Sequence, residues 1–293
     1  MKTIVLQEET INGLKSIKLS KNVFNTESHI KLFNYHGELK IIKQLDELDG
    51  PKYDNKMYTI DLLDKNRSLF PKSLCVPEAL IRVSNINVGF LMPYIVGINL
   101  ADIINDGKYP LDEIKSYLQG IGKILDQLKL IRENTSLKTF YIADLHSSNF
   151  IVNPSTKEIT VVDLDSCKIE NNTEPISFYL YPYGLISNAK EKYRIIRERE
   201  RGIVKVDENT DLFCYTCIIL SYLYGKNVSD LSLNEYYGYL DYLSSIGINE
   251  NLINSFEKLV TKEKNVNPGP YIQSLTEEQV CLSKKSVYDI LKK

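Results

Sequence analysis

Two carboxylates and an amide are closely spaced between Tyr141 and Cys167. Asp144 and Asn149 stand five residues apart in the run D-L-H-S-S-N, and Asp163 follows in V-V-D-L-D-S-C. Phosphoryl transfer uses such a set. One carboxylate takes the proton of the acceptor hydroxyl, while an amide and a second carboxylate hold Mg²⁺ on the phosphates. The stretch therefore indicates Mg²⁺-dependent phosphoryl transfer to a hydroxyl.

A β-hairpin is predicted to position these side chains. Residues 150–152 are apolar, residues 153–157 are rich in turn formers, and residues 159–162 form a β-branched run. Two such runs with an intervening turn predict two antiparallel strands. The hairpin would hold the first carboxylate and the amide at one mouth and the second carboxylate at the other. The alternative is a surface hairpin that carries acidic residues without a shared function.

D-L-H-S-S-N followed by V-V-D-L-D resembles the catalytic and metal-binding loops of the protein-kinase-like superfamily, in which D-x-x-x-x-N precedes D-F-G. The resemblance implies that Asp144 positions and deprotonates the acceptor hydroxyl, and that Asn149 and Asp163 hold Mg²⁺. His146 stands where protein kinases usually have Lys. In this respect the chain is similar to the aminoglycoside- and choline-phosphotransferase branch.

The resemblance implies an α+β, two-lobed kinase-like fold made of one domain. Residues 1–94 would form a small, antiparallel β-rich lobe with one helix. Residues 95–293 would form a mostly helical lobe that carries the catalytic and metal-binding loops at 141–167. The local patterns agree with this order. Strands are predicted over residues 16–20, 29–35, 38–45, 78–83 and 88–92, and helices over 53–70, 110–131 and 212–224, with smaller helices after residue 230.

Strand 38–45 carries the candidate phosphate-binding lysine. In the family, the third strand has a Lys two residues after the residue that touches the adenine of ATP. Ile41 and Lys43 have this arrangement, since alternation puts both on one face of the strand. Lys43 would then bind the α- and β-phosphates. Lys40 is the alternative, disfavoured because it does not share the face of Ile41.

The segment after strand 88–92 resembles the kinase hinge, with Met92 at the gatekeeper position. The adenine amino group needs only a carbonyl from the next residue, and Pro93 keeps its carbonyl. Ile95 would supply an amide and a second carbonyl. The alternative is a plain turn between strand and helix. The cofactors implied by the resemblance are ATP and Mg²⁺.

The chain departs from the family at several positions. No glycine occurs between Ser20 and Thr26, where kinases have a Gly-rich loop. In kinases, a Glu on the helix after the third strand pairs with the strand lysine. The helix predicted over residues 53–70 has no Glu, so Asp61 or Asp64 is expected to form this pair. Asp165 stands in the glycine position of D-F-G, either as a second metal ligand or as a solvated loop acid.

Residues 168–188 stand at the position of the kinase activation segment, and this segment and the residues before Asp144 are also atypical. Ile142 and Ala143 replace the His and Arg that usually precede the catalytic Asp, and residues 168–188 lack an A-P-E ending. Without an arginine before Asp144, a phosphate on residues 168–188 would have no arginine partner. We therefore do not expect phosphorylation of this segment to switch the activity on or off. The mixed-charge run 189–201 is expected to be a solvated helix with ion pairs, the alternative being a groove for an acidic substrate.

Composition and charge limit the possible partners. The chain has 293 residues, of which 43% are hydrophobic and 25% charged, with a net charge of −2. It has neither the basic excess of a nucleic-acid-binding protein nor an apolar run long enough to cross a membrane, so we expect neither partner. Glu8 and Glu9 interrupt the only leader-like run, and we expect a cytoplasmic protein.

Two further residue types have structural interpretations. The five cysteines do not suggest a disulfide framework, and Cys214 and Cys217 are predicted to be buried on a helix rather than to bind zinc or carry out redox chemistry. Asn209-Thr210-Asp211 is predicted to cap that helix, which would end at Gly225. By the resemblance, Asp211 would brace the backbone of the catalytic loop.

The sequence therefore predicts an ATP- and Mg²⁺-dependent phosphotransferase. A protein serine/threonine kinase is the first choice, because no large insertion precedes Asp144. A small-molecule kinase is the second, and a pseudokinase scaffold the third. The candidate catalytic residues are Asp144, Asn149, Lys43 and His146; the nucleotide-binding residues are Lys43, Ile41, Met92, Pro93 and Ile95; the metal ligands are Asn149, Asp163 and Asp165. The partners expected are a nucleotide and a protein or small-molecule hydroxyl acceptor.

Overall fold

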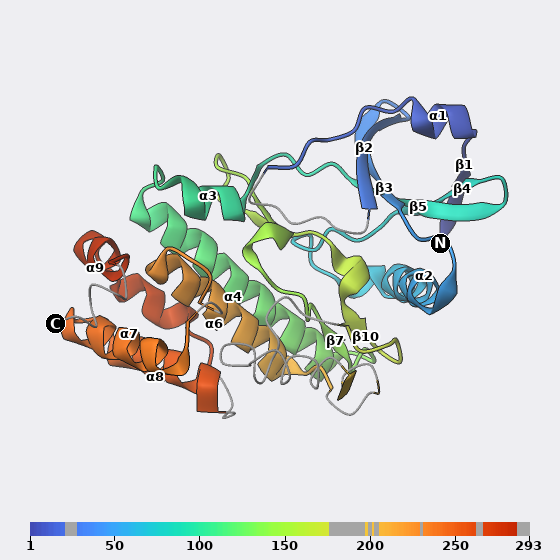
Figure 1. Cartoon of the computed structure of the whole chain (residues 1–293). Helices are drawn as coiled ribbons and strands as arrows, with labels where there is room; N and C mark the ends of the chain where they lie inside the picture. The colour runs from blue at the N-terminus through green and yellow to red at the C-terminus, as the bar shows by residue number, and fades with distance from the viewer. Residues whose placement is uncertain are drawn as a thin grey trace.

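The computed structural model describes residues 1–20, 28–175, 197–198, 201, 205–228, 231–261 and 266–285. A five-stranded sheet with flanking helices comes first, and a mostly helical region follows (Figure 1). We call these the sheet region (described residues up to Pro93) and the helical region (described residues from Ile98). The α+β class and the order of the two regions agree with the sequence prediction.

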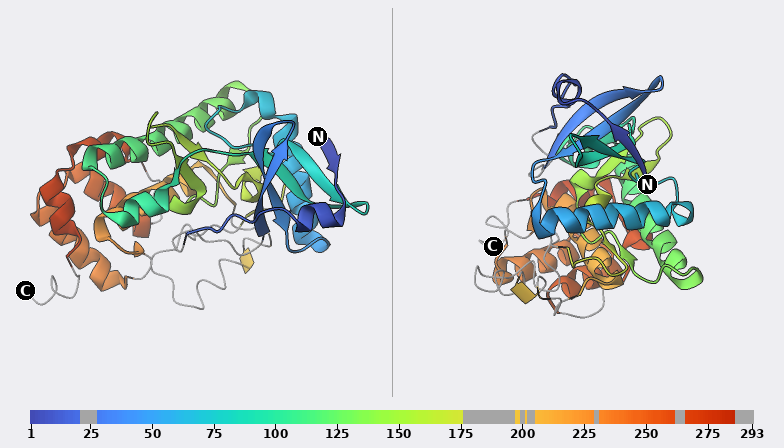
Figure 2. Two further views of the ribbon diagram at one scale, coloured as in Figure 1. Left: turned by 90° about the horizontal axis from the view of Figure 1, so that it is seen from above. Right: turned by 90° about the vertical axis from the view of Figure 1, so that its right-hand side faces the viewer.

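The sheet region contains five strands and two α-helices among its described residues. They are β1 (Lys2–Val5), α1 (Glu8–Asn12), β2 (Ser28–Tyr35), β3 (Glu38–Leu45), α2 (Gly50–Lys65), β4 (Ala79–Val83) and β5 (Ile86–Pro93). Helix α1 covers one face of the sheet and α2 the other, as Figure 2 shows. Strand alternation sends Ile42 to the α1 side and Ile41 and Lys43 to the α2 side.

The prediction of a purely antiparallel sheet is wrong at one edge. The strand order is β1-β4-β5-β3-β2, and β1 pairs parallel with β4 while the other pairs are antiparallel. Parallel pairing needs a long crossover, and most of the sheet region lies between these two strands. The run Lys2–Val5, considered above only as part of a leader-like stretch, is thus an edge strand.

The strand predicted over residues 16–20 is also wrong. Ser16 forms only an isolated bridge to Lys31, flanked by hydrogen bonds from Ile17 N to Ile30 O (2.8 Å) and from Leu32 N to Lys15 O (2.9 Å). The other predicted strands agree with β2 to β5, and the tight turn at His36-Gly37 joins β2 to β3. The helix predicted over 53–70 is shorter: α2 ends at Lys65, and a 3₁₀ turn covers Arg67–Leu69.

Gly89 allows β5 to approach β3 closely at the position of Lys43. It pairs with Gln44, and a Cβ atom at position 89 would overlap the carbonyl oxygen of Lys43. Gly89 therefore helps to fix the position of the backbone that carries Lys43.

The described elements of the helical region begin with β6 (Ile98–Asn99), α3 (Leu100–Asp106), α4 (Leu111–Asn134) and β7 (Phe140–Tyr141). The predicted hairpin follows as β8 (Phe150–Val152) and β9 (Ile159–Val161), which pair antiparallel, and β10 (Lys168–Ile169) pairs with β7. The described helices after that are α6 (Glu208–Tyr224), α7 (Leu233–Ser245), α8 (Glu250–Thr261) and α9 (Glu277–Ser283).

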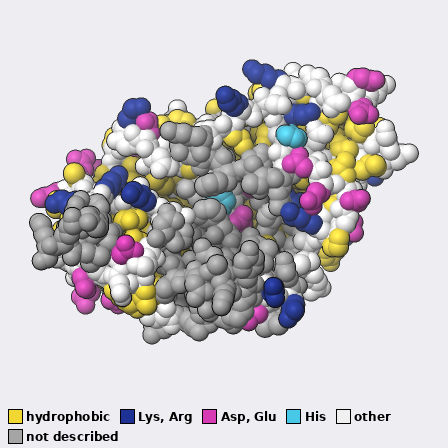
Figure 3. All heavy atoms as spheres, in the orientation of Figure 1, with side chains coloured by type: hydrophobic (Ala, Val, Ile, Leu, Met, Phe, Trp, Pro, Cys, Tyr) yellow, Lys and Arg dark blue, Asp and Glu magenta, His cyan; other side chains and the backbone are white. Residues whose placement is uncertain are grey.

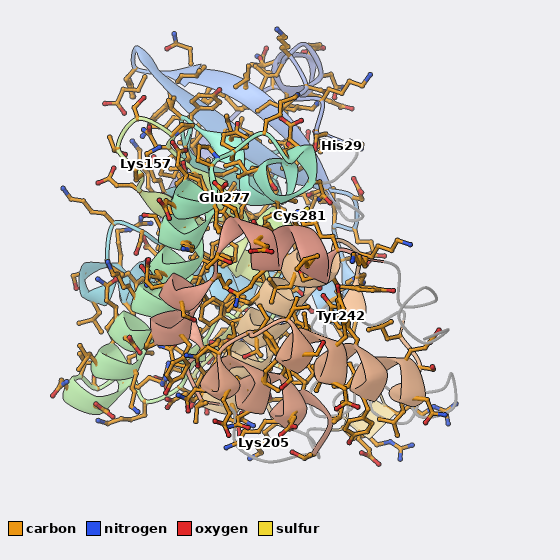
Figure 4. All side chains as sticks on the ribbon, turned by 90° about the vertical axis from the view of Figure 1, so that its left-hand side faces the viewer. His29, Lys157, Lys205, Tyr242, Glu277 and Cys281 are labelled. Atoms are coloured by element: carbon orange, nitrogen blue, oxygen red, sulfur yellow. The ribbon has the colours of Figure 1, made fainter. Side chains whose placement is uncertain are left out.

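The core of the helical region forms around α4 and α6. The apolar residues that recur at three- and four-residue steps along α4, from Leu111 to Leu128, are buried, and the hydroxyl of Tyr215 on α6 donates to the carbonyl of Leu118 at 2.7 Å. Cys214 and Cys217 are buried in α6 as free thiols, as predicted. Helices α7 and α9 lie beside each other (Figure 4), and the hydroxyl of Tyr242 donates to Leu282 O at 3.0 Å.

Helix α6 begins earlier than predicted. Asp207 is its N-cap residue and forms a capping box with Thr210, so Asn209, Thr210 and Asp211 lie inside the first turns. Gly225 ends the helix with a φ of 75°, as predicted from the preference of glycine for this conformation. Helix α4, predicted over residues 110–131, spans Leu111–Asn134, and Pro110 is its N-cap residue just outside the first turn. Among the described residues, no helix is both long and apolar enough to span a membrane.

Candidate functional site

A cavity of about 220 Å³ lies between the sheet region and the helical region. Figure 3 shows histidine and acidic side-chain atoms where these two regions meet. All of the predicted nucleotide-binding residues line this cavity, and two of the predicted metal ligands do so as well. These residues are Ile41, Lys43, Met92, Pro93, Ile95, Asn149 and Asp163. The other predicted site residues, Asp144, His146 and Asp165, are not among its lining residues.

The cavity has apolar walls contributed by both regions. Ile17, Leu19 and Ile30 line it from the sheet region, and Ile151 and Val162 line it from the β8–β9 hairpin. Two opposed aliphatic surfaces suit a flat, largely apolar ring system with a few polar edge groups. None of these five residues was predicted from the sequence to line the site.

Two of the missed residues could have been found from the strand patterns. Ile30 is directly opposite Lys43 in the β2–β3 register, so it must share the face of Lys43 once the turn at His36-Gly37 fixes the pairing. Ile151 alternates with the core residues Phe150 and Val152, and therefore points to the other side of the hairpin.

Lys43 belongs to an ionic cluster at the polar end of the cavity, in which Lys43, Lys56 and Asp165 are buried and Asp163 is partly exposed. Its Nζ atom contacts Asp163 and lies 2.7 Å from Asp165 Oδ1. The Nζ atom of Lys56 on α2 lies 2.9 Å from Asp165 Oδ2. We call Lys43, Lys56, Asp163 and Asp165 the ionic cluster.

The neighbours within the ionic cluster set its protonation. Burial alone would lower the pKa of Lys43, but Asp163 and Asp165 raise it. Burial alone would raise the pKa of Asp165, but Lys43 and Lys56 hold it well below its usual range. Desolvation raises the pKa of Asp163; Lys43 opposes this rise, and the Asp165 carboxylate adds to it. Asp163 is therefore the carboxylate that gains most from an added cation.

Lys40 lies outside this cluster. Its Nζ atom is 3.0 Å from Glu38 Oε2 and 3.0 Å from Glu78 Oε2. The two lysines therefore separate as the alternation of β3 predicts, with only Lys43 beside Ile41 in the cavity.

The prediction that Asp61 or Asp64 pairs with Lys43 is wrong. Asp61 pairs with Lys65 at 2.6 Å, while Asp64 pairs with Arg67 and with the amino group of Met1, both at 3.0 Å. Both carboxylates point away from Lys43, and the side of the helix that faces the ionic cluster carries Lys56 instead.

The interpretation of Asp165 as a solvated loop acid is also wrong. Its side chain is fully buried, and both of its oxygens contact lysines of the ionic cluster.

The loop around Asp144 is held by hydrogen bonds of its own residues. Asn149 Nδ2 donates to the carbonyl of Asp144 at 2.8 Å, which fixes the orientation of the amide, and Asn149 N donates to His146 O at 3.0 Å. The carbonyl of Asn149 accepts from Val162 N at 2.8 Å, which ties the loop to the residue before Asp163. Asp144 and Asp163 are thereby connected through Asn149.

His146 lies beside Asp144. Its Nε2 atom is 3.8 Å from Asp144 Oδ2, and the ring is buried. Burial lowers the pKa of His146 and outweighs the opposing effect of the Asp144 carboxylate. The imidazole is therefore placed to contact Asp144 mainly in its neutral form.

Asp211 braces the start of this loop, as the sequence predicted. Its two carboxylate oxygens accept hydrogen bonds from Ile142 N (3.0 Å) and Ala143 N (2.7 Å). Ala143 has a φ of 65°, a left-handed conformation that costs a non-glycine residue about 1 kcal/mol or more. The carboxylate stabilises this backbone by satisfying two buried amides at once.

Replacing Asp211 by Ala is expected to destabilise the protein strongly, because it leaves two buried N–H groups without acceptors. Each such group costs about 1–3 kcal/mol, so we expect the melting temperature to fall by roughly 5–15 °C. Asp207→Ala is the control, since it removes only a helix cap, worth about 1 kcal/mol. Calorimetry that gave Asp211→Ala the smaller of the two effects would contradict the proposed brace.

The polar end of the cavity suits magnesium better than a closed metal cage. Within the described ranges, no three His, Cys, Asp or Glu side chains converge as a metal cluster. Asn149 and Asp163 line the cavity with an amide and a carboxylate. Mg²⁺ is usually held by one or two carboxylates together with water and substrate phosphates, which matches this limited set of protein ligands.

Several predictions concern residues outside the described part of the chain. The glycine-free interval Ser20 to Thr26 is described only at Ser20, and the segment 168–188 is described only up to position 175. The mixed-charge run 189–201 is described only at positions 197, 198 and 201. The predictions for these segments therefore remain predictions.

Comparison of the sequence with protein-family models and with curated proteins found no match. The resemblance to the protein-kinase-like superfamily therefore rests on the residues and spacings described above.

Proposed function

We propose that the protein is an ATP- and Mg²⁺-dependent phosphotransferase of the protein-kinase-like type, with a hydroxyl group as acceptor. One observation carries the proposal. Residues chosen from three separate segments, the strand at Lys43, the hinge at Met92 to Ile95, and the loops of Asn149 and Asp163, line a single cavity. Acidic residues of a surface hairpin without a shared function would not be expected to line one cavity together with a buried lysine and apolar walls.

The cavity residues divide the binding task between base and phosphates. The aliphatic walls would enclose the adenine, while the backbone carbonyl of Pro93 and the backbone of Ile95 would meet its polar edge. Lys43 would bind the phosphates, and Asn149 and Asp163 would hold Mg²⁺. Mg·ATP would supply the transferable phosphoryl group together with part of the charge neutralisation that the transfer needs.

Asp144 would orient the acceptor hydroxyl and take its proton. The loop bonds through Asn149 and the Asp211 brace hold the backbone at this position, so the carboxylate is presented from a fixed loop. Catalysis of this kind depends on positioning and on charge rather than on a covalent step by the protein.

A serine or threonine of a protein is the acceptor that we favour. Helix α4 ends at Asn134, and the chain reaches Asp144 within ten residues through the short strand β7, without an inserted element. The second candidate is a small-molecule kinase, favoured by His146 beside Asp144. A nucleotide-binding scaffold is the third, favoured by the glycine-free sequence between Ser20 and Thr26.

The proposal is tested by transfer of radiolabelled phosphate from ATP to generic protein substrates, to aminoglycosides and to choline. Lys43→Ala should reduce transfer at least about tenfold because it removes the charge that binds the phosphates. Lys40→Ala is the matched control, since Lys40 lies on the same strand but pairs outside the cavity. Equal effects of the two substitutions would contradict the assignment of Lys43.

A further inference from the structure

A buried lysine of α2 shares a carboxylate with Lys43. Asp165 contacts Lys43 Nζ through Oδ1 at 2.7 Å and Lys56 Nζ through Oδ2 at 2.9 Å, so it joins the two lysines. The side chain of Asp165 is 0% exposed, against 7% for Lys43 and 11% for Lys56. Contacts this deeply buried are little screened by solvent, and loss of one partner leaves a charge uncompensated.

We propose that Lys56 is a positioning residue of the phosphate-binding site. Lys56 compensates the charge of Asp165, so that Asp165 can align Lys43 while the Lys43 charge stays available to the phosphates. The inference rests on the proposed function, because it takes the phosphates of ATP as the ligand of Lys43. In this arrangement Asp165 is a carboxylate partner of Lys43 beside Asp163, rather than a metal ligand.

The charge balance of the ionic cluster supports this role. Lys43 and Lys56 contribute two positive charges, and when Asp163 and Asp165 are both ionised the four groups sum to zero. Without Lys56 the remaining three groups sum to −1. A net negative charge beside Lys43 would repel a phosphate chain and would also hold Lys43 more tightly on the carboxylates.

Helix α2 has attachments that do not depend on the charge of Lys56. Asn172 Nδ2 donates to Thr59 Oγ1 at 2.8 Å, and the amide of Thr173 donates to Asn55 Oδ1 at 2.8 Å. Ile60 packs in the cluster of apolar residues under the sheet with Phe90 and Met92. We therefore expect the helix to stay in place when the lysine charge is removed, so that the charge effect can be measured separately.

Lys56→Met tests the proposal, because methionine keeps much of the aliphatic side chain and removes the charge. Calorimetric titration would give the dissociation constants of Mg·ATP and of adenosine, which lacks phosphates. We expect Lys56→Met to weaken Mg·ATP about tenfold or more, while adenosine binding stays within about twofold. Lys56→Arg keeps the positive charge and should therefore retain most of the wild-type affinity for Mg·ATP. Lys65→Met is the matched control, since Lys65 is on the same helix but 64% exposed, and should change neither constant.

Two results would overturn the inference alone. One is an Mg·ATP affinity that Lys56→Met leaves unchanged, and the other is an equal loss for Mg·ATP and adenosine, which indicates a structural role. If circular dichroism shows that Lys56→Met does not fold, Lys56→Gln replaces it, because glutamine can still donate to Asp165 without a charge. A folded wild-type protein that does not bind Mg·ATP would overturn the proposed function, and this inference with it.

Discussion

Replacing Asp144 by Asn is expected to lower the turnover of phosphoryl transfer at least about a hundredfold. The substitution keeps the volume of the side chain and removes its charge and its ability to accept a proton. A positioned general base contributes about 10²–10⁴ in rate, which sets the size of the expected loss. Asp144 does not line the cavity, so Mg·ATP affinity should stay within a few-fold of wild type.

Single-turnover measurements with saturating Mg·ATP, combined with titration of the nucleotide, separate these two quantities. Asp112→Asn is the control, because Asp112 is a 93% exposed residue at the start of α4. A mutant that turned over like wild type would mean that the loop of Asp144 has been assigned the wrong role. Wild-type protein that bound Mg·ATP without transferring phosphate to any acceptor would favour the scaffold alternative.

Replacing Asp163 by Asn is expected to remove most of the stabilisation that Mg·ATP gives to the folded protein. Asp163 is the cavity-lining carboxylate of the ionic cluster, and the amide of Asn is a weaker ligand for a hard cation. A ligand at a hundred times its dissociation constant stabilises the native state by about 2.7 kcal/mol. For a chain of this size, the wild-type melting temperature should therefore rise by several degrees with Mg·ATP, and that of Asp163→Asn by far less.

The melting temperatures of wild type and Asp163→Asn are measured without ligand, with ATP alone and with Mg·ATP. The shift with ATP in the presence of EDTA should be similar for wild type and Asp163→Asn, because only the metal-dependent part is lost. The Asp112→Asn control should keep the full metal-dependent shift. An Mg·ATP shift of wild-type size in Asp163→Asn would rule out Asp163 as the metal ligand.

Local patterns were sufficient to predict much of the candidate site. The hairpin of residues 150–162 was visible from its apolar runs and turn residues, and the face shared by Ile41 and Lys43 followed from the period of two along a strand. The amphipathic stripe of α4 predicted the long helix before Asp144 in the same way. These features depend on neighbours in the sequence, which is why sequence alone could reveal them.

The parts that failed depend on contacts between distant segments. The rotation of α2 decides whether Lys56 or an aspartate faces the ionic cluster. The apolar residues of that helix are spaced too irregularly to fix this rotation. Burial of Asp165 between two lysines likewise follows from three separate segments meeting. The parallel pairing of β1 with β4 joins residues more than seventy positions apart, and no local pattern in Lys2–Val5 specifies that partner.

The close approach of β5 to β3 at Gly89 has a consequence for inherited variation in this chain. Every amino-acid change that a single base can produce in a glycine codon adds a Cβ atom. At position 89 such an atom would overlap the carbonyl oxygen of Lys43, so each of these variants must shift the backbone of β5 or of β3, the strand that carries this lysine. A Gly-to-Ala or Gly-to-Ser allele, although mild by residue type, would thus act on the backbone that carries Lys43 without replacing the lysine itself.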